Sequence, residues 1–365
     1  MKKFSFFLSC AATALFAIAL TSCEAVEDNP STPGGAPTPQ TITIQKGDTL
    51  ATIINKMAET AGDEIFMEIP AGVDTLYTGE ITIPADKKLT IAGNNLVVLV
   101  STNSILASNS IAVKDIVIDG EKNANPIFKI DGAAPSDVFT IDNISFTNVL
   151  VKNLKSEFFY ANKKKVVVKN FVVDNSIIAV MGATKKTMFS FNGGGLPEFL
   201  SVNNSTIYAD DKTTWANGGF YSTQSGAKMA DLNVESNVIS ITNSTFYGIC
   251  NNQHLSTLRQ NSANGQVYTV KNSIFVNCGK GGTHSELYVG LNGGSAGNDY
   301  NWDVDGNVAM FSGNFLPQKK IGKTDGLINN PVEIDPKFSD DLVAKGWFFP
   351  TNGAFPKGVG DPRWN

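Results

Sequence analysis

One short phrase returns six times along this chain, and it constrains the fold more than any other feature. Each copy alternates apolar and polar residues on both sides of a central Asn, or in one copy an Asp. The copies are IAVKDIVIDG (111–120), FTIDNISFTN (139–148), VVVKNFVVDN (166–175), LSVNNSTIYA (200–209), ISITNSTFYG (239–248) and YTVKNSIFVN (268–277). The central residues, here called pivots, recur every 27 to 39 residues and are Asp115, Asn143, Asn170, Asn204, Asn243 and Asn272. Self-similarity at such a period predicts a repeat architecture.

The apolar positions around each pivot indicate which architecture this is. The residue two before the pivot is always Val or Ile, and the residue three after it is always Ile, Val or Phe. A straight strand would place these two positions on opposite faces, so the chain must bend beside the pivot to bury both. Asn tolerates the left-handed backbone of a sharp bend. We therefore predict an all-β, right-handed parallel β-helix of roughly eight to ten coils, with the pivot side chains bonded into an Asn ladder.

The composition limits the classes of partner. The chain has 365 residues, of which 17% are charged, and its formal net charge is −5. It is rich in Gly and poor in helix-forming stretches, which is typical of an all-β protein outside the cytoplasm. Nucleic-acid binding requires a basic face, so we do not expect a nucleic-acid partner. We expect a monomer.

The first forty residues read as an export and anchoring region. Residues 1–22 have a basic start and a short apolar run, as in a signal peptide. The run ends in Leu-Thr-Ser followed by Cys23, which resembles a bacterial lipobox and implies lipidation of the Cys23 thiol. Residues 23–40 are rich in Pro, Gly, Ser and Thr, which predicts a flexible tether. We expect the β-helix over 41–300 and a C-terminal capping region over 301–365.

One helix is expected, at the start of the β-helix. Residues 50–62 place Leu50, Ile53 and other apolar residues on one helical face, with Asp48 as the expected N-cap and Gly62 as the expected C-cap. Such a helix can cover the open end of the first coil. Together with IFMEIPAG (65–72) and GEITIPADKKLTIAG (79–93), it resembles the entry of pectate-lyase-like β-helices.

The end of the chain carries a second resemblance. The pieces IDPKFSD (334–340) and GVGDPRWN (358–365) resemble a C-terminal domain of uncharacterised function found on β-helix surface lipoproteins of Bacteroidota. This resemblance implies an outer-membrane lipoprotein, anchored through the lipid on Cys23 and exposed at the cell surface. It also implies that the tail covers the last coil.

A quieter repeat between the pivots supplies the functional candidates. In the register that turns most apolar residues inward, one residue of each short strand points outward. These outward residues are Lys129, Tyr160, Ser190, Tyr221, Arg259 and Tyr288. Tyrosine rings with neighbouring cations can hold sugar rings, so we expect carbohydrate binding at Lys129, Tyr160, Tyr221, Arg259 and Tyr288. Half-exposed strand tyrosines without a ligand are the alternative.

Three functions remain open. The first is a surface lipoprotein that binds polysaccharide as part of glycan utilisation, without a cofactor or metal site. The second follows from the resemblance and is a polyuronate lyase, with Arg259 as the base, Lys185, Lys186 or Lys212 as further candidates, and Ca²⁺ as a possible charge partner. The third is a structural or adhesive surface protein.

Two cysteines lie in the expected β-helix. Cys250 and Cys278 follow their pivots by seven and six residues, so they fall at nearly equivalent places on consecutive coils. We expect two free, buried thiols, with a disulfide as the alternative. No CxxC spacing of a zinc site occurs.

Overall fold

The computed structural model describes most of the chain beyond residue 43. The described residues are 44–45, 47–59, 61–130, 137–161, 165–181, 186–191, 194–209, 219–223, 229–250, 256–258, 266–278, 289–291, 301–304, 309–311 and 334–365. All of them belong to one compact unit, Pro37–Asn365. The signal peptide, Cys23 and the tether lie outside the described residues.

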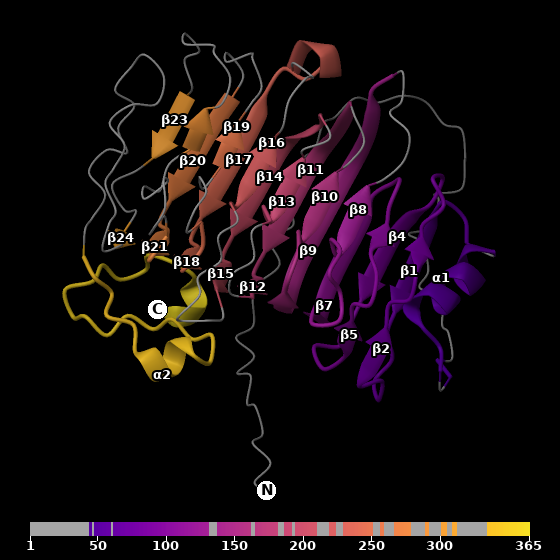
Figure 1. Ribbon diagram of the computed structural model, residues 1–365, viewed down its shortest axis with the longest axis horizontal. Helices are drawn as coiled ribbons and strands as arrows, with labels where there is room; N and C mark the ends of the chain where they lie inside the picture. Colours follow the sequence, from indigo (N-terminus) through magenta and orange to yellow (C-terminus); the bar gives the residue numbers. More distant parts are fainter. Residues whose placement is uncertain are drawn as a thin grey trace, which may run out of the picture. The chain divides into compact units, whose positions relative to one another are not determined.

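Two all-parallel sheets form the body of this unit in the pattern of a parallel β-helix, which confirms the predicted fold class (Figure 1). The larger sheet has 16 strands and curls into two limbs, and the smaller sheet has 8 strands. Each coil contributes a strand to the first limb, then to the second limb, then to the eight-stranded sheet. Every pairing is parallel, because consecutive coils run in the same direction.

The first limb contains the beginnings of two long strands, β7 (Ile111–Asp119) and β9 (Phe139–Leu154), together with β1 (Glu64–Glu68), β4 (Lys88–Ala92), β11 (Val166–Asp174), β14 (Leu196–Asn203), β17 (Asn237–Thr242), β20 (Gln266–Lys271) and β23 (Asn301–Val304). The second limb contains the ends of β7 and β9 together with β2 (Thr75–Tyr77), β5 (Val98–Val100), β12 (Ile177–Val180), β15 (Thr206–Ala209), β18 (Thr245–Tyr247), β21 (Ile274–Val276) and β24 (Ala309–Phe311). The ladder therefore continues past residue 300, where the sequence pattern becomes irregular.

The eight-stranded sheet is made of very short strands. They are β3 (Ile81–Thr82), β6 (Ile105–Leu106), β8 (Phe128–Ile130), β10 (Phe159–Ala161), β13 (Phe189–Phe191), β16 (Tyr221–Thr223), β19 (Ser256–Leu258) and β22 (Val289–Leu291). A strand of two or three residues presents only one outward side chain, so each coil adds one residue to a single outward column.

Left-handed Asn residues form the corner between the two limbs, but two of the predicted pivots are wrong. Asn143 and Asn170 lie within strands β9 and β11 and pair with each other. The residues with positive φ at this corner are Asn148 (54°) and Asn175 (47°), five residues later. Strand register then aligns the corner residues of successive coils as Asp115, Asn148, Asn175, Asn204, Asn243 and Asn272. In those two coils the apolar alternation begins about five residues earlier than in the others. Asn143 and Asn170 therefore looked equivalent to the true corner residues.

The Asn ladder exists along this corrected column. The Asn148 amide donates to Asp115 Oδ1 over 2.8 Å, and the Asn175 amide donates to Asn148 Oδ1. Further along the stack, the acceptor can be the residue just before the corner residue. Asn243 Nδ2 donates to Asn203 Oδ1 at 3.1 Å, and Asn203 directly precedes the corner residue Asn204. These bonds link one coil to the next at its sharpest bend.

A buried Ser ladder lies directly after the Asn ladder, and sequence reasoning missed it. Each Ser hydroxyl accepts the backbone N–H of the equivalent residue one coil earlier, as Ser205 Oγ does from the Ser176 N–H at 3.1 Å. The same hydroxyl donates to the carbonyl two residues before it, over 2.7 Å from Ser205 to Asn203. The four members are Ser176, Ser205, Ser244 and Ser273. Each buried hydroxyl thus forms hydrogen bonds with a backbone N–H and a backbone carbonyl that cannot pair between strands at the bend.

Aromatic rings fill the interior. Phe128 and Phe146 lie 4.9 Å apart between ring centroids, and Phe159 and Phe171 lie at the same separation. Further along, Phe246 stacks on Phe275 at 4.7 Å. The fully buried large side chains are Tyr221, Phe128, Phe146, Phe158, Phe159, Phe171, Phe189, Phe191, Phe220, Phe246 and Phe275. Their burial contributes to the hydrophobic free energy of these coils together with that of the aliphatic residues.

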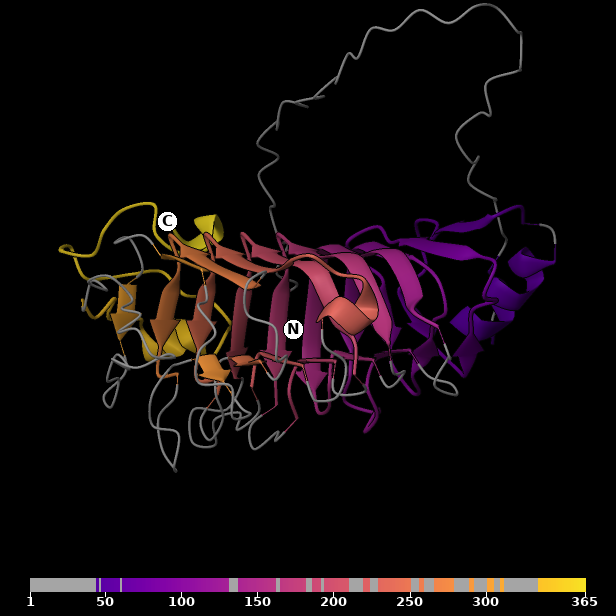
Figure 2. The same cartoon turned by 90° about the horizontal axis from the view of Figure 1, so that it is seen from above.

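Helix α1 (Leu50–Ala58) lies at the beginning of the stack, as Figure 2 shows. The predicted caps are both wrong. Thr49 caps the helix, because its side chain accepts from the Thr52 N–H while the Thr52 side chain accepts from the Thr49 N–H. Asp48 instead accepts from the Gln45 N–H at 2.8 Å. The C-cap is Glu59, since the helix ends at Ala58, four residues before Gly62.

The segment 334–365 packs along the side of the second limb. It contains α2 (Asp340–Val343) and the 3-10 helix η2 (Pro362–Trp364), and a further 3-10 helix, η1 (Met229–Leu232), precedes β17. Phe348 contacts Tyr208 and Tyr247, with ring centroids 5.1 and 5.5 Å apart. The contacts of this segment in the described structure are therefore lateral, whereas we expected it to cover the last coil.

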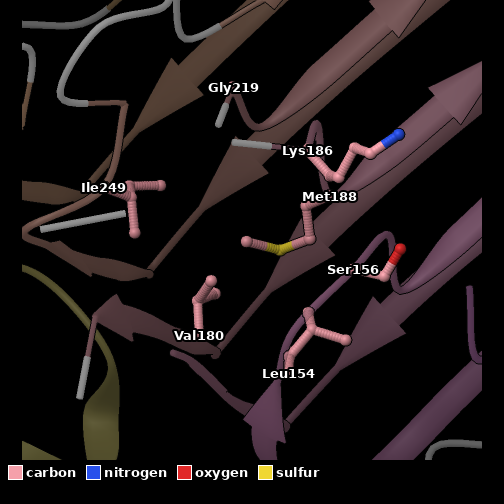
Figure 3. A pocket seen from close by; sticks show the side chains of 7 residues that line it. All are labelled: Leu154, Ser156, Val180, Lys186, Met188, Gly219 and Ile249. Atoms are coloured by element: carbon pink, nitrogen blue, oxygen red, sulfur yellow. The ribbon is translucent and has the colours of Figure 1, made fainter. Parts of the chain in front are cut away.

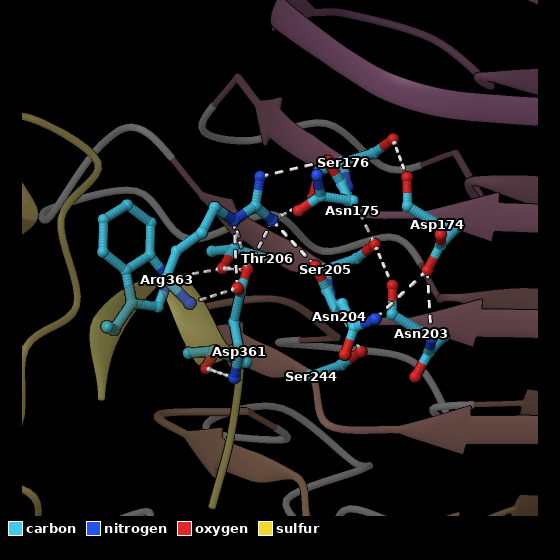
Figure 4. A network of polar contacts seen from close by, with 12 residues as sticks. Asp174, Asn175, Ser176, Asn203, Asn204, Ser205, Thr206, Ser244, Asp361 and Arg363 are labelled. Carbon is cyan, nitrogen blue, oxygen red and sulfur yellow. Dashed lines mark hydrogen bonds and ion pairs between the residues drawn. The ribbon is translucent and has the colours of Figure 1, made fainter. Parts of the chain in front are cut away.

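Two residues at the end of the chain, Asp361 and Arg363, hold this segment against the second limb (Figure 4). Arg363 donates to the backbone carbonyls of Asn175, Ser176 and Asn204, at 3.2, 2.8 and 3.0 Å. Asp361, which is fully buried, pairs with Arg363 and accepts from the Thr206 hydroxyl at 2.6 Å. The GDPRW ending thus connects the corners of consecutive coils.

Candidate functional site

The outward column of the eight-stranded sheet contains two of the five predicted carbohydrate-binding residues. Lys129 of β8 and Tyr160 of β10 are direct register partners on neighbouring strands, and both are half-buried. Their strands alternate as predicted, with the residues on either side of each buried completely. The two strands that carry this cationic and this aromatic side chain are therefore about 4.8 Å apart along the stack.

The prediction that Tyr221 points outward is wrong. Tyr221 pairs with Phe189, is fully buried, and lies 5.9 Å from Phe191 between ring centroids. Ser222 takes the outward position instead, opposite Ser190. The chain offers two adjacent aromatic residues here, Phe220 and Tyr221, and both are fully buried. Taking Phe220 as an inward strand residue placed Tyr221 outward, whereas strand β16 begins at Tyr221 and turns it inward.

Strand register continues the column through the next two coils. Thr257 of β19 aligns with Ser222, and Gly290 of β22 aligns with Thr257. The register positions of these coils are thus Thr257 and Gly290, where we expected Arg259 and Tyr288. Both Arg259 and Tyr288 lie outside the described residues, so the catalytic and binding roles assigned to them stay predictions.

Hydroxyl groups continue the column beyond Tyr160. Ser190 is fully buried and Ser222 is 5% exposed. Ser190 Oγ has no hydrogen-bond partner within the described part of the structure. The column thus changes from a half-exposed Lys and Tyr to buried hydroxyls within two coils.

A small pocket lies where the second limb turns into the eight-stranded sheet (Figure 3). Its space is about 230 Å³, including the part open to solvent, and its lining residues are Leu154, Ser156, Val180, Lys186, Met188, Gly219 and Ile249. Most of that space is open to solvent, and the enclosed part is about 10 Å³, which is the space that one water-sized group occupies. The pocket can therefore receive only a small substituent of a larger ligand.

The polar edge of the pocket is built around a nearly buried carboxylate. Glu157 Oε2 accepts from the Ser156 hydroxyl at 2.6 Å, and Glu157 Oε1 lies 3.7 Å from Lys186 Nζ. The Glu157 side chain is 9% exposed and the Lys186 side chain 63% exposed. Sequence reasoning named Lys186 only as a secondary base candidate and overlooked Glu157, whose neighbours Ser156 and Phe158 gave no sign of a charged site.

The remaining candidates for chemistry are sparse in the described ranges. Those ranges contain no group of three or more His, Cys, Asp or Glu residues that could hold a metal ion. None of the described helices is long and apolar enough to span a membrane. Lys185 and Lys212 lie outside the described residues.

Cys250 and Cys278 are free thiols in the interior, as we expected. Burial raises the pKa of the Cys278 thiol to about 12, and burial likewise raises the pKa of Cys250 well above its usual value. Thiols held in the protonated form are poor nucleophiles and poor metal ligands. We therefore assign these cysteines to packing.

Comparison with known proteins yields one match. Residues 72–210 are similar to a family described as "Domain of unknown function (DUF4957)". This stretch extends from β2 to β15 and includes Lys129, Tyr160, Glu157 and Lys186. No curated protein and no solved structure matches the chain.

Proposed function

We propose that this protein is a lipid-anchored surface protein that binds polysaccharide along the outer face of its eight-stranded sheet. The observation that carries the proposal is the direct pairing of Lys129 with Tyr160 on adjacent strands. A sugar ring can stack on the exposed part of the tyrosine ring while the ammonium group contacts a hydroxyl or carboxylate of the neighbouring sugar. A ligand of two or more sugar units is suitable, because the ring and the cation lie on two adjacent strands.

The proposal favours binding over catalysis for a physical reason. A lyase needs a base beside the acidic proton and a cation beside the carboxylate. The only Arg candidate for that base, Arg259, lies outside the described residues. Binding by a ring and a cation requires no such base. Lyase and adhesive functions remain as outcomes of the experiment below.

Affinity electrophoresis through gels that contain single polysaccharides tests the proposal. We expect retardation of the wild type by at least one glycan, and a loss of most of that retardation in Tyr160→Ala and Lys129→Ala. The matched controls are Tyr77→Ala, which removes a 44% exposed tyrosine on β2, and Lys88→Ala, which removes an exposed lysine on β4. Retardation that is unchanged in Tyr160→Ala and Lys129→Ala would overturn the proposed site.

Two further measurements separate the alternatives. Ultraviolet absorbance of unsaturated products, on polyuronates with Ca²⁺, would reveal a lyase. Binding to cells or proteins without retardation by any glycan would indicate an adhesin. For the anchor, Cys23→Ala is expected to release the protein from membranes into the soluble fraction. Retention of this variant in the membrane fraction would contradict lipidation.

A further inference from the structure

The pocket beside Lys186 combines an apolar interior with a polar rim. Leu154, Val180, Met188 and Ile249 are each at most 4% exposed and form the interior. Figure 3 shows the Lys186 amino group and the Ser156 hydroxyl on the same side of these apolar side chains. A ligand group that suits this arrangement ends in a methyl group and carries a hydrogen-bond acceptor next to it.

The charges at the rim favour a neutral ligand group. Lys186 Nζ lies 3.7 Å from the Glu157 carboxylate, so the positive charge of the ammonium group already has a negative partner. Since an ammonium group has three donors, Lys186 retains donors for an acceptor from outside. A ligand carboxylate would lie close to the carboxylate of Glu157 and would be repelled by it.

The pocket lies beside the proposed glycan-binding column. Ser156 and Glu157 lie just before the strand that carries Tyr160, with Phe158 in a bend between them, so Glu157 and Tyr160 are at most about 11 Å apart along the chain. The next coil follows the same path, because the Phe158 N–H donates to the Met188 carbonyl at 3.0 Å. A sugar on Tyr160 therefore has a substituent-sized pocket within the length of about two sugar units.

We propose that this pocket binds an acetyl group carried by the polysaccharide. The methyl group enters between Val180 and Met188, and Lys186 Nζ donates to the acetyl carbonyl. The inference rests on the proposed function, since it names the class of glycan that the same face selects. The acetyl group can come from an O-acetyl ester or from an N-acetylated amino sugar.

The experiment compares glycans before and after removal of their acetyl groups, at a pH that keeps the freed amines of the hexosamine polymer uncharged. One pair is an O-acetylated polysaccharide before and after mild alkali, and the other is an N-acetylhexosamine polymer and its deacetylated form. We expect the acetylated member of one pair to bind about fourfold more tightly, which is the gain from burying one methyl group. The pair that shows the difference identifies the linkage.

Two variants tie the preference to the pocket. Val180→Ile adds a methylene group to the space, and Lys186→Met keeps the aliphatic stem but removes the donors. Each is expected to abolish the preference for acetylated glycan while leaving binding of the deacetylated form unchanged. Lys152→Met, which alters an exposed lysine on the outer face of the second limb, is the matched control and should keep the preference. Thermal unfolding of each variant shows whether its fold is intact.

Distinct outcomes separate this inference from the proposed function. If no glycan binds the wild type, both the proposed function and this inference are overturned. If glycans bind but acetylated and deacetylated forms bind equally, only the inference is overturned. A preference that survives in both pocket variants likewise means that the pocket is a packing void only.

Discussion

At the scale of single residues, the two thiols show how strongly this interior disfavours charge. Cys250 is fully buried and Cys278 is 1% exposed, and both belong to the main hydrophobic core. Removing a thiolate from water costs far more than removing a thiol, so burial favours the protonated form. The folded protein therefore holds these protons to a higher pH than the unfolded chain does.

This difference predicts a loss of stability in alkali. The Cys278 pKa rises from 9.0 to about 12 on folding, so its contribution is complete below about pH 9 and is lost as the pH rises toward 12. The free energy of unfolding should fall by up to about 1.4 kcal/mol per pH unit for this thiol. Urea unfolding between about pH 8 and 11 should show a steeper decline in the wild type than in Cys278→Ala. Equal slopes would contradict the prediction.

At the scale of elements, the corner between the limbs depends on two adjacent ladders. The Asn residue supplies the left-handed backbone, and the following Ser residue satisfies the backbone groups that the bend exposes. A non-glycine residue without a polar side chain costs about 1–2 kcal/mol in the left-handed region. The corner residues are therefore far more constrained than the Asn residues within the strands.

Asn175 and Asn170 provide a matched test within a single coil. Asn175 has φ of 47° and donates to Asn148, whereas Asn170 is an exposed strand residue with one long bond of 3.4 Å to the Asp142 carbonyl. We expect Asn175→Ala to lower the free energy of unfolding by about 1–3 kcal/mol and Asn170→Ala by less than about 0.5 kcal/mol. Asn175→Gly should recover the backbone part of the loss. Similar losses for both alanine variants in urea unfolding would disprove the corrected column.

At the scale of the whole molecule, the end of the chain stabilises coils that lie far from it in sequence. Arg363 contacts carbonyl groups that precede it by 188, 187 and 159 residues. Gly360 has φ of 93° and donates to the Asn272 carbonyl at 2.7 Å, so the segment approaches the corner closely. The segment 334–365 therefore acts as a lateral strap across consecutive coils.

Arg363→Ala should loosen this strap. The change removes three carbonyl contacts and leaves the fully buried Asp361 carboxylate without its cation. Because Arg363 itself is 27% exposed, we expect a loss of about 2–3 kcal/mol in the free energy of unfolding, below the usual cost of breaking a fully buried pair. Limited proteolysis should then cut within 334–365 sooner than in the wild type. Lys357→Ala, an exposed change in the same segment, is the control, and equal cleavage rates in both variants would refute the role of Arg363.

The sequence alone predicted the architecture and one part of the candidate site. Val or Ile two residues before the pivot and an apolar residue three after it indicated inward faces on both sides of a bend. Lys129 and Tyr160 were placed correctly, since each is flanked by two apolar residues that must both be buried. The N-cap was misplaced by one residue because Asp48 and Thr49 are both good capping residues.

The register of the short strands was decided only by the tertiary structure. A strand of three residues beside two adjacent aromatic residues, as at Phe220 and Tyr221, fits the alternation of inward and outward side chains in two registers. These registers differ by one residue. The register depends on hydrogen bonds to the coils before and after. A shift of one residue in that register turns every outward side chain inward. The pocket at Lys186 and the strap at Arg363 likewise arise from residues brought together across coils. The local pattern of this sequence therefore determined a parallel β-helix, whereas inter-coil pairing decided which side chains face the solvent.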